Sequence, residues 1–140
     1  MPEESTTPDP VALTRQSFEA GRRHDIDAVM GFYAPNAVWD MSDVGIGIFK
    51  GVAAIRSFVE DWWGTWGDHT MEVEEIVHLG HGVVLLSVRE DGRLVGSDGH
   101  VEQRRVGVLV WVRGVIERNA TYADINEARA AAERLAEERG

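Results

Sequence analysis

The chain has 140 residues and no cysteine, so its sequence excludes disulfides, thiolate metal ligands and a cysteine nucleophile. Its 24 acidic and 14 basic residues give a net charge of −10, which repels nucleic acids and anionic membranes, and neither is expected as a partner. No stretch reaches the roughly 20 apolar residues of a membrane span, and the polar start lacks the pattern of a signal peptide. We expect a cytoplasmic protein with a disordered tail at residues 1–9 and a single domain at residues 10–138.

Two helices are predicted at the start of the domain. Asp9 can cap a helix over residues 10–23, because its carboxylate accepts from free backbone amides and Pro10 needs no donor in the first turn. Asp25 can cap a second, short helix that ends at Pro35, because a proline disfavours helical geometry in the residue before it.

A short strand and a loop are predicted next. Residues 37–41 alternate between apolar and polar side chains, which is typical of a strand. Residues 42–50 contain Gly45 and Gly47 and predict a flexible, partly apolar loop. We interpret this loop as a lid over a pocket.

A third, amphipathic helix is predicted after Gly51, and it ends near Gly64 or Gly67. Trp63 lies off the main apolar stripe and is a candidate for contact with a partner subunit. The stripe itself recurs at helical spacing and consists of Ile55, Phe58, Val59, Trp62 and Trp66.

The second half of the chain changes to a period of two, which indicates strands. The predicted strands are residues 71–79, 83–90, 101–113 and 115–122, with tight turns at residues 80–82 and 113–114. In the third strand Val106, Val108 and Val110 alternate with residues that are also apolar or glycine, so both faces of this strand are apolar. Neither face is expected to be exposed to solvent. We therefore expect a homodimer that covers the convex face of the sheet.

The order of the elements predicts the fold. Asp124, followed three residues later by Glu127, predicts a final helix that runs to residue 138. Helices first and then a run of strands describe a cone-shaped α+β barrel. Its N-terminal helices would pack in the concave face of a curved, mixed and mostly antiparallel sheet, with a C-terminal helix added. An internal pocket is expected between the two layers.

The runs at residues 24–40, 49–58, 112–118 and 122–124 resemble the nuclear transport factor 2-like superfamily, most of all its SnoaL-like polyketide cyclase and ketosteroid isomerase branch. The resemblance covers residues 10–132 and implies the cone-shaped fold with its pocket. It does not imply one reaction, because this fold hosts isomerases, cyclases, epoxide hydrolases, dehydratases and proteins without known chemistry.

The resemblance also assigns the isomerase positions. In ketosteroid isomerases a carboxylate base works with a tyrosine and a protonated carboxylic acid that donate to the oxyanion. Here the base position falls on Met41, the tyrosine position on Ser17 and the acid position on Val108. Methionine and valine cannot move a proton, so the resemblance does not carry this reaction over to the chain.

Two other reactions of the superfamily find partial matches. Limonene epoxide hydrolases use an Asp/Arg/Asp cluster; Arg89 and Asp91 match its Arg-x-Asp spacing, but Thr121 stands at the other aspartate position. A SnoaL-type cyclase uses an aspartate or histidine acid/base, which His100 or Asp98 can supply if their hairpin folds over the mouth of the pocket.

Residue alternation supplies further candidates. If Val108 points inward, Arg104 does too, and the last strand points Asn119 and Thr121 inward beside Glu117. An inward Arg104 beside Glu117 is either a structural ion pair or a group that stabilises an oxyanion.

Asp40 completes the acid/base candidates. It follows Trp39, and a carboxylate against an indole can have a raised pKa suited to general acid work, although a solvated strand end is the alternative. The catalytic candidates are therefore Asp40, Arg104 and His100. The ligand-binding candidates are Ser17, Tyr33, Trp39, Met41, Phe58, Trp62, Trp66, Arg89, Val108, Asn119 and Thr121.

Two hypotheses stay open. The first is a cofactor-independent isomerase, cyclase or hydrolase that acts on a small hydrophobic ring compound, polyketide-like or steroid-like. The second is non-catalytic binding of a hydrophobic ligand, or a dimeric interaction module. No cofactor is expected. No metal site is expected either, because His78 and His81 straddle a predicted turn rather than a helix face.

Overall fold

The computed structural model describes residues 9–140. The predicted tail at residues 1–9 lies outside the described residues, except for Asp9, which is the N-cap of the first helix. The described elements are α1 (Pro10–Arg22), α2 (Ile26–Met30), β1 (Tyr33–Met41), η2 (Ser42–Val44), β2 (Gly47–Lys50), α3 (Val52–Thr65), β3 (Trp66–Gly80), β4 (Val83–Leu94), β5 (His100–Val112), β6 (Val115–Tyr122) and α4 (Ile125–Arg139).

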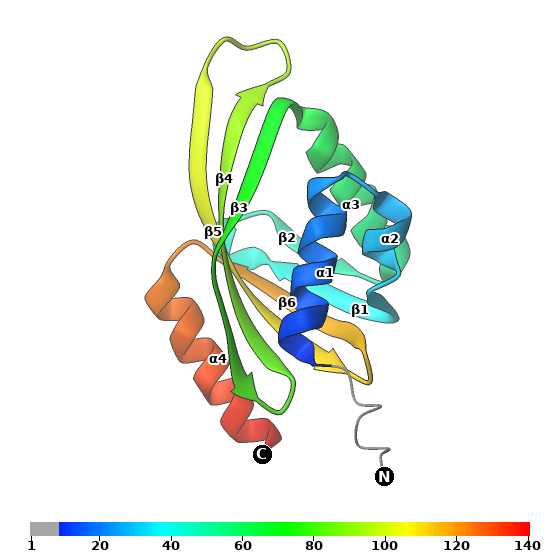
Figure 1. Cartoon of the computed structure of the whole chain (residues 1–140), viewed down its shortest axis with the longest axis vertical. Coiled ribbons are helices and arrows are strands. Elements are labelled where there is room, and N and C mark those ends of the chain that lie inside the picture. The colour runs from blue at the N-terminus through cyan, green and yellow to red at the C-terminus, as the bar shows by residue number, and fades with distance from the viewer. Residues whose placement is uncertain (1–8) are drawn as a thin grey trace.

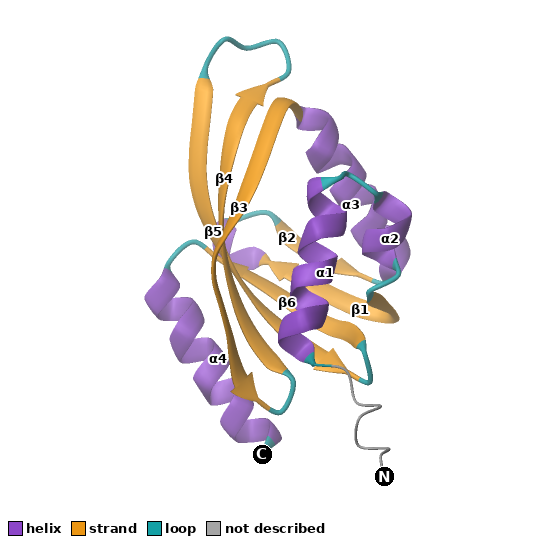
Figure 2. Cartoon of the chain, viewed as in Figure 1, coloured by secondary structure: helices purple, strands orange, loops and turns teal. Residues whose placement is uncertain are grey.

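The six strands form one sheet in the order β2-β1-β6-β5-β4-β3. Only β1 and β6 pair in parallel, and the other neighbours are antiparallel. Helices α1, α2 and α3 lie on the concave side of the sheet, and α4 lies on the opposite side (Figures 1 and 2). The predicted cone-shaped α+β fold, with a curved, mostly antiparallel sheet, is confirmed.

Local signals placed three helix starts correctly. The carboxylate of Asp9 accepts from the Val11 amide at 3.0 Å, and that of Asp25 accepts from the Ala28 amide at 3.2 Å. Asp124 accepts from the amides of Asn126 and Glu127 at 2.7 and 3.0 Å. Each such cap stabilises its helix by about 1 kcal/mol.

The second helix is shorter than predicted. It ends at Met30, and Tyr33 already belongs to β1, so the prediction of a helix up to Pro35 is wrong. The parallel pairing with β6 takes over here, because the Ile116 amide donates to the Phe32 carbonyl at 2.7 Å. The register shifts between Tyr33 and Val38, which accommodates a proline that has no amide hydrogen for the ladder.

The prediction of a flexible lid at residues 42–50 is also wrong. Its second half is strand β2, which pairs antiparallel with β1 so that Asp40 is opposite Ile48. Gly45 and Gly47 have φ angles of 78° and 122°, values that glycine adopts without strain, and they turn the chain back onto β1. The segment is therefore the edge of the sheet.

Helix α4 covers the convex face next to the middle of β5. Val106 and Val108 are buried there against Ala128, Ala132 and Ala136, whose small side chains allow the helix to approach closely. This packing corrects the premise of the predicted homodimer, because the second apolar face of β5 is covered within the chain.

Trp63, predicted to meet a partner subunit, packs within its own chain. Its ring stacks on His24 with centroids 4.6 Å apart and an interplanar angle of 2°. It also contacts the apolar cluster between α2, α3 and β1.

Candidate functional site

A cavity of about 150 Å³ lies between α1 and the concave face of the sheet. Most of its wall is apolar, and three polar side chains, those of Arg105, Asn119 and Thr121, interrupt it. Gly107 completes the floor. The apolar side chains are Phe18, Trp39, Met71, Leu86, Val88 and Leu109.

The register of β5 and β6 decides which residues reach this cavity. Leu109 is opposite Asn119, and Gly107 is opposite Thr121. Residues opposite each other in an antiparallel ladder share one face of the sheet. Asn119 and Thr121 line the cavity, but on β5 the inward residues are Arg105, Gly107 and Leu109.

The predicted inward orientation of Arg104 and Val108 is therefore wrong. Val108 lies beneath α4, and Arg104 lies on the exposed outer face, where it pairs with Glu74. The prediction from alternation failed because the odd-numbered and the even-numbered residues of β5 are both largely apolar. The period of two therefore does not decide which of them face α1.

Glu90 forms the centre of a buried polar cluster beside the cavity. Its side chain is fully buried, and Arg105 donates through Nη2 to its Oε2 at 3.3 Å. The Nε atom of Arg105 lies 3.2 Å from Oε1, but within the described part of the chain it has no aligned hydrogen-bond partner. The guanidinium also lies 5.2 Å above the Trp62 ring, which holds it between a carboxylate and an aromatic face.

Three more groups donate to Glu90. His69 contacts Oε2 at 2.7 Å, the Trp62 indole contacts Oε2 at 3.1 Å, and Gln103 contacts Oε1 at 2.8 Å. Burial alone would raise the pKa of Glu90, but the hydrogen bond from His69, the charge of Arg105 and the bonds from Gln103 and Trp62 outweigh it. Together they lower the pKa of Glu90 to about 2, so the carboxylate is ionised at neutral pH.

His69 links this cluster to the surface. An ionised Glu90 only accepts, so Nε2 of His69 carries the hydrogen and, in the neutral ring, Nδ1 is the acceptor. Nε2 of His24 lies 3.3 Å from that Nδ1. Burial, and then the proximity of His69, lowers the pKa of His24. The Trp66 ring stacks on His69 with centroids 4.5 Å apart.

Asn119 and Thr121 differ in how far their polar atoms are satisfied. The Trp39 indole donates to the Thr121 hydroxyl at 2.8 Å, and the Asn119 amide donates to the Tyr33 hydroxyl at 3.1 Å. The Oδ1 atom of Asn119 is buried and has no hydrogen-bond partner among residues 9–140. Burial raises the pKa of Tyr33 to about 12, so its phenol is neutral.

Phe18 and Met71 separate the cavity from the surface. Both also line a groove of about 430 Å³ between α1 and β3, together with Arg15 and Arg22. Because the two recesses share these side chains, a ligand that enters from the groove passes between Phe18 and Met71. Methionine is flexible enough to move aside.

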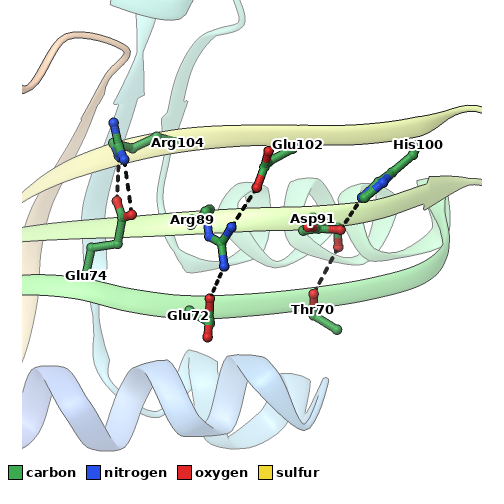
Figure 3. Close-up of polar contacts among 8 residues, drawn as sticks. All are labelled: Thr70, Glu72, Glu74, Arg89, Asp91, His100, Glu102 and Arg104. Atoms are coloured by element: carbon green, nitrogen blue, oxygen red, sulfur yellow. Dashed lines mark hydrogen bonds and ion pairs between the residues drawn. The ribbon is translucent and has the colours of Figure 1, made fainter.

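Arg89, Arg104 and His100 lie on the outer face of β3, β4 and β5, away from the cavity (Figure 3). Arg89 pairs with Glu72 and with Glu102, the latter at 2.7 Å. His100 pairs with Asp91 near the end of the hairpin. The hairpin does not fold over the mouth of the pocket, and none of these three predicted site residues is among those that line the cavity.

Asp40 also points away from the cavity that Trp39 lines. The amide of Ser42 and its hydroxyl both donate to Oδ1, and Arg118 donates to Oδ2 at 2.9 Å. The hydrogen bonds from Ser42 are the main reason that the pKa of Asp40 is lowered, with the charge of Arg118 adding to them against the effect of burial. The expectation of a raised pKa is wrong.

The other predicted ligand-binding residues are mostly structural. Ser17 donates to the Thr14 carbonyl at 3.0 Å within α1, and Met41 is fully buried. Phe58, Trp62 and Trp66 continue a row of rings from Trp39, with successive centroids 5.5, 6.3 and 5.8 Å apart. These rings pack α3 onto the sheet beside the cavity rather than lining it.

Across residues 9–140, no group of three or more His, Cys, Asp or Glu side chains is arranged to hold a metal ion. Over the same residues, no helix is both long and apolar enough to cross a membrane.

A family model described as SnoaL-like domain matches residues 14–119, most of the chain. The chain belongs to the SnoaL-like family. No curated protein matches the sequence.

Solved structures share the fold of this SnoaL-like protein. A putative SnoaL-like polyketide cyclase from Shewanella putrefaciens superposes with a TM-score of 0.70 at 12% identity, over 95% of this chain and 90% of that chain. An epoxide hydrolase of the LEH-like type from M. tuberculosis gives 0.68 at 18% identity, over 89% and 90%. A protein with a ketosteroid isomerase-like fold from Catenulispora acidiphila, solved with trimethylamine, gives 0.71 at 12% identity, over 91% and 94%. Identities this low establish the fold alone.

Proposed function

We propose that this SnoaL-like protein binds a small, mostly apolar molecule in the cavity between α1 and the sheet. The observation that carries the proposal is the buried, unpartnered Oδ1 of Asn119 in an otherwise apolar wall. An unsatisfied buried acceptor costs about 1–3 kcal/mol, and a ligand that donates to it removes that cost. Apolar cavities with a few convergent polar groups are the usual form of a ligand site.

The wall of the cavity supports binding rather than acid/base catalysis. Among the described residues, the only titratable side chain that lines it is Arg105, and guanidinium groups do not release a proton in proteins. Glu90 lies behind Arg105 and is held ionised by its donors. An isomerase, cyclase or hydrolase that moves protons would need a group within reach whose pKa is near neutrality. Of the two hypotheses, non-catalytic binding therefore has the better support.

The test uses a ligand that needs only an apolar cavity. Toluene is titrated into isotopically labelled protein, and methyl NMR signals are followed. We expect saturable shifts of the Leu86, Val88 and Leu109 methyl signals, which line the cavity.

Two glycine variants, one inside the cavity and one outside it, control this test. Gly107→Leu fills the cavity, since a Cβ at this position lies only 3.3 Å from Asn119 Oδ1, and should abolish the shifts. Gly64→Ala adds a methyl group that meets nothing within 4 Å, and should leave them unchanged. Toluene shifts that persist unchanged in Gly107→Leu would rule this cavity out.

A homodimer is a separate proposal. The outer face of β3, β4 and β5 that carries Arg89 and Arg104 remains exposed beyond α4, and its alternating charges offer polar contacts to a second copy (Figure 3). Light scattering at micromolar concentration measures the mass. A value of 15.5 kDa would exclude the dimer, and twice that mass would support it.

A further inference from the structure

We propose that the ligand is a neutral compound with a single ring, whose carbonyl oxygen accepts from Arg105 and whose hydroxyl donates to Asn119. The inference rests on the proposed function of the cavity and names the class of molecule that it takes.

The volume of the cavity sets the size of the ligand. An apolar cavity of roughly 150 Å³ takes up one benzene molecule, and the cavity here has about that volume. Steroids and polyketides with three or four fused rings are larger than this space and would have to displace Phe18 and Met71. The size narrows the polyketide-like or steroid-like compound expected from the sequence to one with the bulk of a single substituted ring.

The charges behind the wall select a neutral ligand. The Glu90 carboxylate and the Arg105 guanidinium together carry no net charge, and Glu90 is fully buried. A carboxylate on the ligand would add a second anion, and the described residues of the cavity wall offer no further cation to balance it. A buried unbalanced charge is costly. A carbonyl oxygen accepts a hydrogen bond without this cost.

Arg105 has donors to spare for such an oxygen. A guanidinium carries five N–H groups, and the hydrogen bond to Glu90 uses one of those on Nη2. The contacts with Glu90 and with the Trp62 ring hold its plane in place at the cavity wall. A fixed donor binds such an oxygen more tightly, because little side-chain entropy is lost on binding.

The hydroxyl of the ligand is assigned by Asn119. Its amide nitrogen donates to the neutral Tyr33 phenol, which leaves Oδ1 as a free acceptor. Gly107 lies opposite Thr121 on the neighbouring strand, and a Cβ there would approach Oδ1 to 3.3 Å. Glycine at this position thus keeps space open beside the acceptor.

Calorimetric titration of the purified full chain at neutral pH tests the class with four probes: toluene, acetophenone, 4-hydroxyacetophenone and 4-hydroxybenzoate. We expect affinity to rise from toluene to acetophenone and again to 4-hydroxyacetophenone. Each added hydrogen bond should contribute roughly fivefold to tenfold. 4-Hydroxybenzoate should bind at least about tenfold more weakly than 4-hydroxyacetophenone.

Two variants test the assigned contacts, with circular dichroism confirming that each is folded. Asn119→Leu keeps the branched shape and the number of side-chain heavy atoms but removes the acceptor, and it should abolish the advantage of 4-hydroxyacetophenone over acetophenone while acetophenone still binds. Glu90→Gln removes the buried anion and should reverse the order of 4-hydroxyacetophenone and 4-hydroxybenzoate. Glu74→Gln, the same change on the outer face, should leave the order as in the wild type.

The outcomes separate this inference from the proposed function. If toluene binds but neither the carbonyl nor the hydroxyl improves affinity, the ligand class is wrong and the binding function stands. If 4-hydroxybenzoate binds most tightly to the wild type, the argument from charge is overturned. If none of the four probes binds, both proposals fail.

Discussion

Arg104 and Arg105 are neighbours on β5, and each forms an ion pair with a glutamate, but they face opposite sides of the sheet. The side chain of Arg104 is 56% exposed and pairs with a partly exposed Glu74. That of Arg105 is 22% exposed and pairs with a fully buried Glu90 that also accepts from His69, Trp62 and Gln103. The same two residue types thus occupy very different surroundings.

Burial, rather than the pairing itself, decides how much each of these ion pairs contributes to stability. Water screens the outer pair, so it contributes about 0–1 kcal/mol. Removing one partner of the inner pair leaves the other charge buried and uncompensated, which costs about 3–5 kcal/mol. The inner pair is also the one that borders the cavity, so its electrostatics affect any ligand.

The largest expected effect is the loss of the inner carboxylate. Glu90→Ala should lower the free energy of unfolding by about 3–5 kcal/mol, because Arg105 loses its counter-ion and three donors lose their acceptor. Glu74→Ala, on the outer face, should lower it by less than about 1 kcal/mol. Urea denaturation measures both, and equal losses would show that the two pairs do not differ.

Acid should expose the same contrast. The pKa of Glu90 falls from its ordinary value of 4.5 in the unfolded chain to about 2 in the fold. Its stabilisation is therefore fully present above pH 4.5 and is lost as the pH falls toward 2. The loss should be on the order of 3 kcal/mol.

Denaturation curves between pH 6 and pH 2 check this prediction. Glu90→Gln should remove most of the extra acid sensitivity of the wild type, whereas Glu74→Gln should keep most of it. Acid sensitivity that is the same in Glu90→Gln as in the wild type would contradict the assignment.

Shortening a side chain beneath α4 tests the two faces of β5 in another way. Val108 is buried against Ala128 and Ala132, so Val108→Ala should cost about 2 kcal/mol of stability. It should not change ligand affinity, because Val108 does not line the cavity. A large change in affinity would instead support the orientation expected from the sequence, with Val108 pointing into the cavity.

The smallest effect is expected at Arg104. Arg104→Met should change stability by less than about 1 kcal/mol and leave the affinity for 4-hydroxyacetophenone unchanged. A loss of binding in this variant, measured by calorimetry, would show that Arg104 takes part in ligand binding.

Much of the fold could be predicted because its signals are local. Aspartates before three helices gave the caps, and the change to a period of two marked β3 to β6. Strand β2 was missed because it has only four residues and begins at Gly47, the second of two glycines that predict a loop. The end of α2 was missed because tertiary pairing of Tyr33 with β6 overrides helix propensity.

The site was harder to predict. Glu90 lies between Arg89 and Asp91, and three charged residues in a row are typical of the solvated end of a strand. Strand β4 continues to Leu94, however, so Glu90 lies within the strand, and its pairing with Gln103 places it on the concave face of the sheet. A predicted strand that extended beyond residue 90 would have made Glu90 a candidate site residue. Arg105 was missed because the phase of β5 depends on contacts with α1 and α4 that no local pattern reveals.

The most direct test of the account locates a bound ligand by NMR. Intermolecular nuclear Overhauser effects are measured between the ring protons of 4-hydroxyacetophenone and the methyl groups of the protein. We expect contacts with Leu86, Val88 and Leu109, and none with Val106 and Val108 on the other face. Contacts with the valines beneath α4, or no contacts with any methyl group, would contradict it.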